Sequence, residues 1–167
     1  MTLITIIGPS GAGKDTAARI LSELTGIPVL ISYTTRPIRA GEEPDREHIF
    51  VNECTTAKDQ MLAYTVYGDY EYWTELSQIQ DSAIYVIDEE GLRDLRQRFP
   101  DIHVISIYLT ASKLTRRKRG VTTERMQRDD LREEFPLDYY DYRISNNFTK
   151  EHLREALRVV ADTLSEH

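Results

Sequence analysis

The sequence has little cysteine, no long apolar run and no excess of positive charge, and each of these absences narrows the function. A single cysteine, Cys54, excludes a disulfide within the chain and favours a reducing compartment. No apolar stretch reaches the roughly 20 residues of a membrane-spanning helix, and no basic and then apolar leader opens the sequence. We therefore expect a cytoplasmic protein with no membrane association.

The charge balance argues against a protein whose main task is to hold nucleic acid. The chain has 21 Lys and Arg against 28 Asp and Glu, a formal net charge of −7 at pH 7, whereas proteins that bind a nucleic-acid backbone usually carry basic patches. An Asn-Lys-x-Asp motif, which would suggest a regulatory GTPase, is also missing. The length of 167 residues favours a single domain.

The most informative stretch is Gly8-Pro9-Ser10-Gly11-Ala12-Gly13-Lys14-Asp15-Thr16, which follows an apolar run and precedes a segment with helical spacing. A strand, a glycine-rich turn and a helix in this order form the phosphate-binding loop of proteins that use ATP or GTP. Glycines let backbone N–H groups converge on a phosphate, and the helix adds its positive N-terminus. Lys14 supplies a compact cation for the β- and γ-phosphates. We expect the nucleotide to contact Gly8, Ser10, Gly11, Ala12, Gly13, Lys14, Asp15 and Thr16.

Magnesium is expected beside these phosphates. Asp15 stands where Ser or Thr usually helps to hold the ion, but Thr16 follows it and can hold the ion directly or through water. Asp88 ends an apolar strand and is the second candidate ligand. An aspartate at this point is also an ordinary helix cap, so both interpretations of Asp88 stay open.

Apolar runs and helical spacing alternate along most of the chain. The alternation predicts an α/β fold in which helices cover both faces of a parallel sheet. With the phosphate loop, this is the three-layer α/β/α arrangement of P-loop NTPases. Strands are predicted over residues 2–7, 28–31, 83–87, 103–109 and 142–145. Helices are predicted over residues 14–25, 89–99, 112–118 and 123–135, and from Thr149 onward.

Residues 33–80 interrupt this alternation and are more polar. Short strands are predicted over residues 48–51, 63–67 and 70–73, and short helices over residues 55–62 and 74–80. We expect one domain over residues 1–167, with residues 33–80 inserted as a small lobe and residues 112–135 forming a short helical lid.

Two groups of arginines suggest further phosphate contacts. Arg36 and Arg39 stand three apart in a loop and can form a forked clamp for a phosphate. Five more arginines gather around Gly120, where a charge run can be a solvated helix face or a lid that closes over phosphates. We favour the lid, with Arg119 and Arg125 joining Lys14 in catalysis and Arg116 or Arg117 as a third arginine; the remaining member of the group is Arg128.

The run from Ser32 to Glu42 resembles the guanylate kinase family, with a serine, Thr-Thr-Arg, a proline region with a second arginine, and Gly-Glu. The phosphate loop, the strand that ends at Asp88 with Gly91 after it, and the segments 119–126 and 144–147 also resemble the family. The resemblance implies Mg²⁺-dependent transfer of phosphate from ATP to a nucleoside monophosphate, most simply GMP or dGMP. It places Asn146 near adenine and makes 33–80 the acceptor-binding lobe. On the acceptor side it implies Ser32, Arg36, Arg39, His48, Tyr70 and Asp88.

The lobe departs from the family pattern. His48 occupies the place of a phosphate-binding tyrosine, and Ala63 the place of a glutamate that recognises guanine. A guanine-binding pocket needs a carboxylate that accepts hydrogen bonds from the N1–H group and the exocyclic amine of guanine. Asp69, Glu71 or Glu75 can supply this carboxylate from another position.

Other functions therefore stay open. The ending Lys14-Asp15-Thr16 also resembles small kinases such as some phage deoxynucleotide kinases and the ribosyl bisphosphate phosphokinase of phosphonate metabolism. A kinase for another deoxynucleotide or for ribose 1,5-bisphosphate is one alternative. A non-catalytic guanylate-kinase-like module that binds proteins is another, although such modules tend to lose the phosphate loop. The sequence leaves the oligomeric state open.

Overall fold

The computed structural model describes residues 1–46, 48–132 and 135–165. Its main sheet has four parallel strands in the order β6-β1-β7-β8. Their near-continuous apolar residues suit strands that are buried on both faces. Their bounds are β1 Thr2–Ile7, β6 Ser82–Val86, β7 His103–Thr110 and β8 Tyr142–Ser145.

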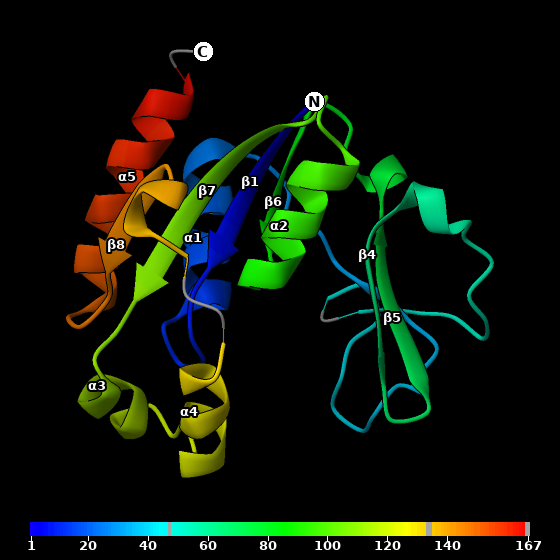
Figure 1. The fold of residues 1–167 in the computed structure, drawn as a ribbon, viewed down its shortest axis with the longest axis horizontal. Coiled ribbons are helices and arrows are strands. Elements are labelled where there is room, and N and C mark those ends of the chain that lie inside the picture. Colours follow the sequence, from blue (N-terminus) through cyan, green and yellow to red (C-terminus); the bar gives the residue numbers. More distant parts are fainter. Residues whose placement is uncertain (47, 133–134, 166–167) are drawn as a thin grey trace.

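Helices cover both faces of this sheet. Helices α1 (Lys14–Thr25) and α5 (Lys150–Ser165) pack with Ile4 and Ile6 of β1 in one apolar cluster. Leu3 and Ile7 point to the other face, where they meet leucines of α2 (Glu89–Arg98). This alternation along one strand separates the layers, with α2 in front of the sheet and α1 behind it (Figure 1). The prediction of a three-layer α/β/α fold is confirmed.

One strand of this layer is shorter than predicted. The segment 28–31 makes only a parallel bridge, between Val29 and Ile84 at the edge beside β6. Leu30 N donates to Ile84 O and Ile84 N donates to Pro28 O. Proline has no N–H for a further ladder bond, and the chain leaves the sheet after this pair.

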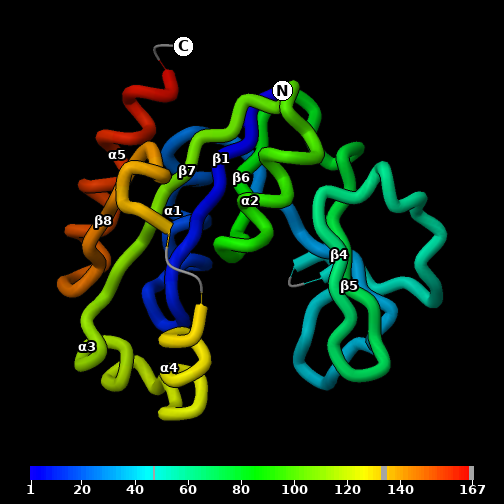
Figure 2. Tube along the Cα trace, in the orientation of Figure 1, coloured from blue at the N-terminus to red at the C-terminus, as the bar shows by residue number. Residues whose placement is uncertain are grey.

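A second, smaller sheet lies beside the first (Figure 1, Figure 2). Its strand order is β3-β2-β5-β4. Its strands are β2 Tyr33–Thr34, β3 Ile49–Phe50, β4 Met61–Tyr67 and β5 Tyr70–Glu75. The strands β4 and β5 form an antiparallel hairpin that turns at Gly68, whose φ of 63° suits glycine. The two predicted strands of this hairpin are confirmed.

The helix predicted over residues 55–62 is wrong, and the short helix predicted over residues 74–80 is reduced to a single 3₁₀ turn. Only the 3₁₀ turns η1 (Lys58–Gln60) and η2 (Leu76–Gln78) form there. Met61 and Leu62 are buried and extended because Met61 pairs with Glu75 of β5. Pairing with a distant strand therefore outweighs the local helical pattern.

Two short helices follow β7 and lie below the ends of β1 and β7 (Figure 1). Helix α3 (Lys113–Lys118) is capped by Ser112 and helix α4 (Thr123–Asp130) by Thr122, whose hydroxyls accept backbone N–H groups. Helix α4 ends before the predicted boundary at residue 135, and residues 133–134 lie outside the described ranges. The 3₁₀ turn η3 (Leu137–Tyr139) leads to β8. Within the described ranges, every helix is too short or too polar to cross a bilayer.

Candidate active site

The phosphate loop, residues 8–16, runs from the end of β1 into the first turn of α1 and depends on its glycines. Gly11 and Gly13 have φ values of 76° and 96°, which side chains disfavour. A Cβ atom at Gly13 would lie 2.5 Å from Asn146 Nδ2, and one at Gly8 would lie 2.1 Å from the Leu109 carbonyl oxygen. The loop therefore needs glycine both for its backbone conformation and for its close neighbours.

A small cavity of about 180 Å³ opens over this loop. Lys14 donates from Nζ to the carbonyl oxygens of Gly8 (2.8 Å) and Pro9 (3.2 Å). Burial lowers the pKa of Lys14, and nearby Arg132 lowers it further. The cavity brings six predicted nucleotide-binding residues together with one lid arginine: Ser10, Gly11, Gly13, Lys14, Asp15, Thr16 and Arg125.

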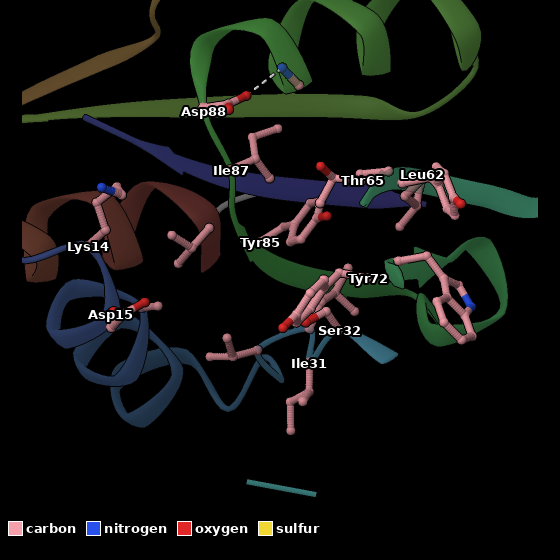
Figure 3. Close-up of a pocket in the computed structure, with 18 of the residues that line it drawn as sticks. Lys14, Asp15, Ile31, Ser32, Leu62, Thr65, Tyr72, Tyr85, Ile87 and Asp88 are labelled. Atoms are coloured by element: carbon pink, nitrogen blue, oxygen red, sulfur yellow. Dashed lines mark hydrogen bonds between the residues drawn. The ribbon is translucent and has the colours of Figure 1, made fainter. Parts of the chain in front are cut away.

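A much larger cavity, about 1350 Å³, lies between the main sheet and the lobe. Figure 3 shows Lys14 and Asp15 at one end of it and Leu62 and Thr65 at the other. Lys14 and Asp15 line both cavities, so the two cavities are adjacent and share these residues. The large cavity therefore extends from the lobe to the phosphate loop.

The lobe presents hydroxyls and rings to the large cavity. Ser32 Oγ lies 2.8 Å from His48 Nδ1, and the Tyr72 ring packs edge-on against His48 with centroids 5.6 Å apart. All three residues line the cavity, together with Ala63. The predicted acceptor residue Tyr70 does not line either described cavity, and Tyr72, two residues later on β5, lines the larger one.

The predicted forked clamp is not assembled around either cavity. Arg36 is 6% exposed, and its two terminal nitrogens donate to Glu42 at 2.8 and 2.9 Å. Glu42 also accepts from the backbone N–H of Arg39, and these bonds lower its pKa to about 2. Neither arginine lines a described cavity. A phosphate clamp here stays a prediction, and it requires Glu42 to share Arg36.

Two of the predicted catalytic arginines connect the lid to the phosphate loop. Arg116, 4% exposed, donates from Nε to the Ser10 carbonyl oxygen at 2.7 Å and pairs with Asp129. Arg119 donates to the carbonyl oxygens of Gly11 (2.9 Å) and Asn146 (2.8 Å). Only Arg125 of the three lines a described cavity.

Asn146, predicted to lie near adenine, also supports the loop. Its Nδ2 donates to the Ala12 carbonyl oxygen at 2.8 Å, and the residue is buried. Gly13 leaves room for this amide, as the Cβ geometry above shows. The end of β8 therefore fixes the phosphate loop from the side.

The sequence analysis did not predict three charged residues that lie at this site. Asp129 accepts from the backbone N–H (3.0 Å) and hydroxyl (3.2 Å) of Ser10. Arg132 lies between Asp129 and Glu89, the first residue of α2. Asp129 and Arg132 come from a segment dense in both charges, which by pattern alone resembles a solvated helix face.

The residues present fit a magnesium ion held mainly by nucleotide phosphates. Thr16 lines the small cavity, and Asp88 lines the large one while its Oδ1 caps α2 by accepting from Gly91 N at 2.8 Å. In the described part of the chain, no three His, Cys, Asp or Glu side chains gather as a metal site. Magnesium needs only one or two protein oxygens when phosphates and water complete its shell. When bound, it would neutralise charge on the phosphates.

Comparison with known proteins shows which family this chain resembles over its length. The family model described as guanylate kinase matches residues 1–166. The guanylate kinase of Latilactobacillus sakei is 30% identical over 169 residues, covering 87% of this chain and 81% of that protein. The guanylate kinase of Nitrobacter hamburgensis is 29% identical over 140 residues, covering 77% of this chain but only 64% of that protein's length.

A solved structure agrees with the fold. The crystal structure of guanylate kinase from Anaplasma phagocytophilum matches with a TM-score of 0.67 at 21% identity, and the match covers 99% of this chain and 85% of that one. The match of the family model to nearly every residue, together with these relatives, shows that the chain belongs to the guanylate kinase family.

Proposed function

We propose that the protein is an ATP-dependent nucleoside monophosphate kinase that converts GMP or dGMP to the diphosphate. The observation that carries this proposal is the pair of adjacent cavities that share Lys14 and Asp15 as lining residues. The small one is bounded by the phosphate loop. The large one exceeds the volume of about 300–1,000 Å³ usual for small-molecule sites, so it has room for an acceptor nucleotide.

The chain's residues account for the chemistry by position and charge. Lys14 would leave the loop carbonyls and bind the donor phosphates, and Arg125 also lines the small cavity and would add a second cation. The acceptor phosphate is already largely ionised at pH 7, because its second pKa is about 6. No general base is then required, and transfer depends on alignment and charge stabilisation.

The family makes a guanine nucleotide the first candidate acceptor, but the residues of the lobe favour a second candidate, a different phosphorylated acceptor. None of Asp69, Glu71 and Glu75 lines the large cavity. Glu71 accepts from Tyr64 OH at 2.8 Å, and Glu75 accepts from Trp73 Nε1 at 3.1 Å. Among the described lobe residues, the cavity lining has no carboxylate. This observation supports a kinase for another phosphorylated acceptor, such as a different deoxynucleotide or ribose 1,5-bisphosphate.

The substrates follow from this activity. We infer ATP with Mg²⁺ as phosphate donor, a small nucleotide as acceptor, and a cytoplasmic location. The net charge of −7 disfavours nucleic acid as a partner.

The test is ADP release with ATP, Mg²⁺ and one acceptor at a time: GMP, dGMP, AMP, CMP, UMP, dTMP or ribose 1,5-bisphosphate. Turnover with GMP or dGMP at least about tenfold above the others, a difference of about 1.4 kcal/mol, supports guanine specificity. Preference for a different acceptor selects the second candidate. Absence of turnover with every acceptor overturns the kinase proposal.

A further inference from the structure

The arginines near the two cavities differ in whether their N–H groups already make hydrogen bonds within the protein. Arg116 and Arg119 make hydrogen bonds of 2.7 to 2.9 Å to carbonyl oxygens of the loop and of Asn146. Arg125 lines the small cavity over the phosphate loop. Arg132 lines the large cavity together with Lys14, Asp15 and Asp88. Among the described residues of the predicted lid, 112–132, Arg132 is the arginine that lines the cavity proposed for the acceptor.

Charge, and no hydrogen bond to a described residue, holds the Arg132 guanidinium in place. One terminal nitrogen lies 3.6 Å from Glu89 Oε2 and the other lies 3.5 Å from Asp129 Oδ1. Both distances exceed those of ordinary N–H···O hydrogen bonds. Within the described ranges, its guanidinium makes no hydrogen bond, and the side chain is 31% exposed. Its donors can therefore reach a ligand in the cavity.

The two carboxylates fix where this guanidinium lies. The Asp129 side chain is 3% exposed and accepts hydrogen bonds from Ser10. The Glu89 side chain is 10% exposed, and its Oε2 is buried without a hydrogen-bond partner among the described residues. Since an unpaired buried carboxylate oxygen is costly, Glu89 is best explained as the countercharge that positions Arg132.

Lys14 and Arg132 are like charges near one another. After burial, Arg132 is the largest cause of the lowered Lys14 pKa. An anion bound between two cations relieves their repulsion. A phosphoryl group that passes from the loop to the acceptor is such an anion.

We propose that Arg132 is a catalytic residue that binds the phosphoryl group during its transfer between donor and acceptor, which rests on the proposed kinase function. In this step the bond between the γ-phosphorus and the β,γ-bridging oxygen breaks, and its electron pair stays on ADP. A bond forms between the γ-phosphorus and an oxygen of the acceptor phosphate. Arg132 donates hydrogen bonds to the non-bridging oxygens in transit and exchanges no proton.

The test compares Arg132→Gln and Arg132→Lys with Arg158→Gln as a matched control. Arg158 is exposed on α5 and lines neither described cavity. We expect Arg132→Gln to lower kcat by about 100- to 1,000-fold, as for loss of one transition-state donor, with the Kd for ATP within about threefold. Arg132→Lys recovers less than about a tenth of kcat because an ammonium cannot form the planar fork. Arg158→Gln keeps kcat within about twofold.

Three results would overturn the inference while leaving the kinase function intact. One is a kcat of Arg132→Gln within about threefold of wild type, and another is full kcat in Arg132→Lys. The third is a loss of kcat matched by an equal rise in the Kd for ATP, which would make Arg132 an ATP-binding residue. The assay uses the acceptor that the wild-type protein turns over fastest, and melting temperatures confirm that each variant folds. A wild-type protein that is inactive with every acceptor would overturn both the proposed function and this inference.

Discussion

The phosphate loop, where we propose that the donor binds, and the lobe, where we propose that the acceptor binds, are built in different ways. The phosphate loop is nine consecutive residues, 8–16, that follow β1 and include the first three residues of α1, and Asn146 and Arg119 support it. The lobe is assembled from four short strands, two of them only two residues long. The residues proposed to bind the donor phosphates therefore come from one continuous motif. The residues proposed to bind the acceptor depend on which side chains the pairing of distant strands brings to the cavity.

The largest effect is expected on the donor side, from Lys14→Ala. Loss of this cation should lower kcat by about 1,000-fold or more, because charge stabilisation dominates phosphoryl transfer. Lys150→Ala, an exposed change at the start of α5, is the control and should keep wild-type turnover. If Lys14→Ala retains more than about a tenth of the wild-type kcat, Lys14 does not supply the main charge stabilisation of phosphoryl transfer.

Ala63→Glu asks whether one side chain sets the lobe's base preference. Ala63 lines the large cavity at the position where the family resemblance implies a guanine-binding glutamate. The new carboxylate should raise the ratio of kcat/KM for GMP to that for AMP by about 10- to 100-fold, since two hydrogen bonds to guanine are gained. Ala57→Glu is exposed and lines neither described cavity, and it should leave the ratio unchanged. An unchanged ratio in Ala63→Glu would place the base elsewhere.

A smaller effect is expected from Ser32→Ala, which removes the hydroxyl that contacts His48. Loss of about 1 kcal/mol of hydrogen bonding should raise the acceptor KM by about fivefold without changing the KM for ATP. Initial rates with each substrate varied in turn measure both constants. A change in the KM for ATP alone would contradict the division into two sides.

The smallest effect concerns acid stability of the lobe. The pKa of Glu42 is lowered from 4.5 to about 2, chiefly by its hydrogen bonds with Arg36. A lowered carboxylate pKa stabilises the fold above the unfolded value and loses this contribution as the pH falls from 4.5 through 2. Melting temperature should therefore depend less on pH between 4.5 and 2 in Glu42→Gln than in wild type. The difference should be slight, because solvent screens such pairs, and identical profiles would show that the pair contributes nothing.

The sequence was most informative where chemistry and structure are local. The apolar runs of β1, β6 and β7 and the loop after β1 were readable because each pattern spans a few adjacent residues. Residues 55–62 were wrongly predicted as a helix because pairing of Met61 with Glu75 is invisible in the local pattern. The family relationship followed from motifs that are continuous in the chain.

The site could be predicted only in part for the same reason. Lys14 and Arg125 lie at the small cavity as the motif suggested. The ion pairs of Arg132 with Glu89 and of Arg36 with Glu42 depend on how side chains meet in three dimensions. Arg132 stands in a segment of mixed charge, so nothing in its neighbours separates it from a solvated residue.

The proposed function requires that one phosphoryl group pass directly from a donor at the small cavity to an acceptor in the large one. The most direct measurement is a single-turnover reaction with Mg²⁺, ATP labelled in its γ-phosphate, and GMP, followed by separation of the products. We expect the label to appear in GDP with wild-type protein and not with Lys14→Ala. Label that appears only in inorganic phosphate, or that stays in ATP, would contradict the account.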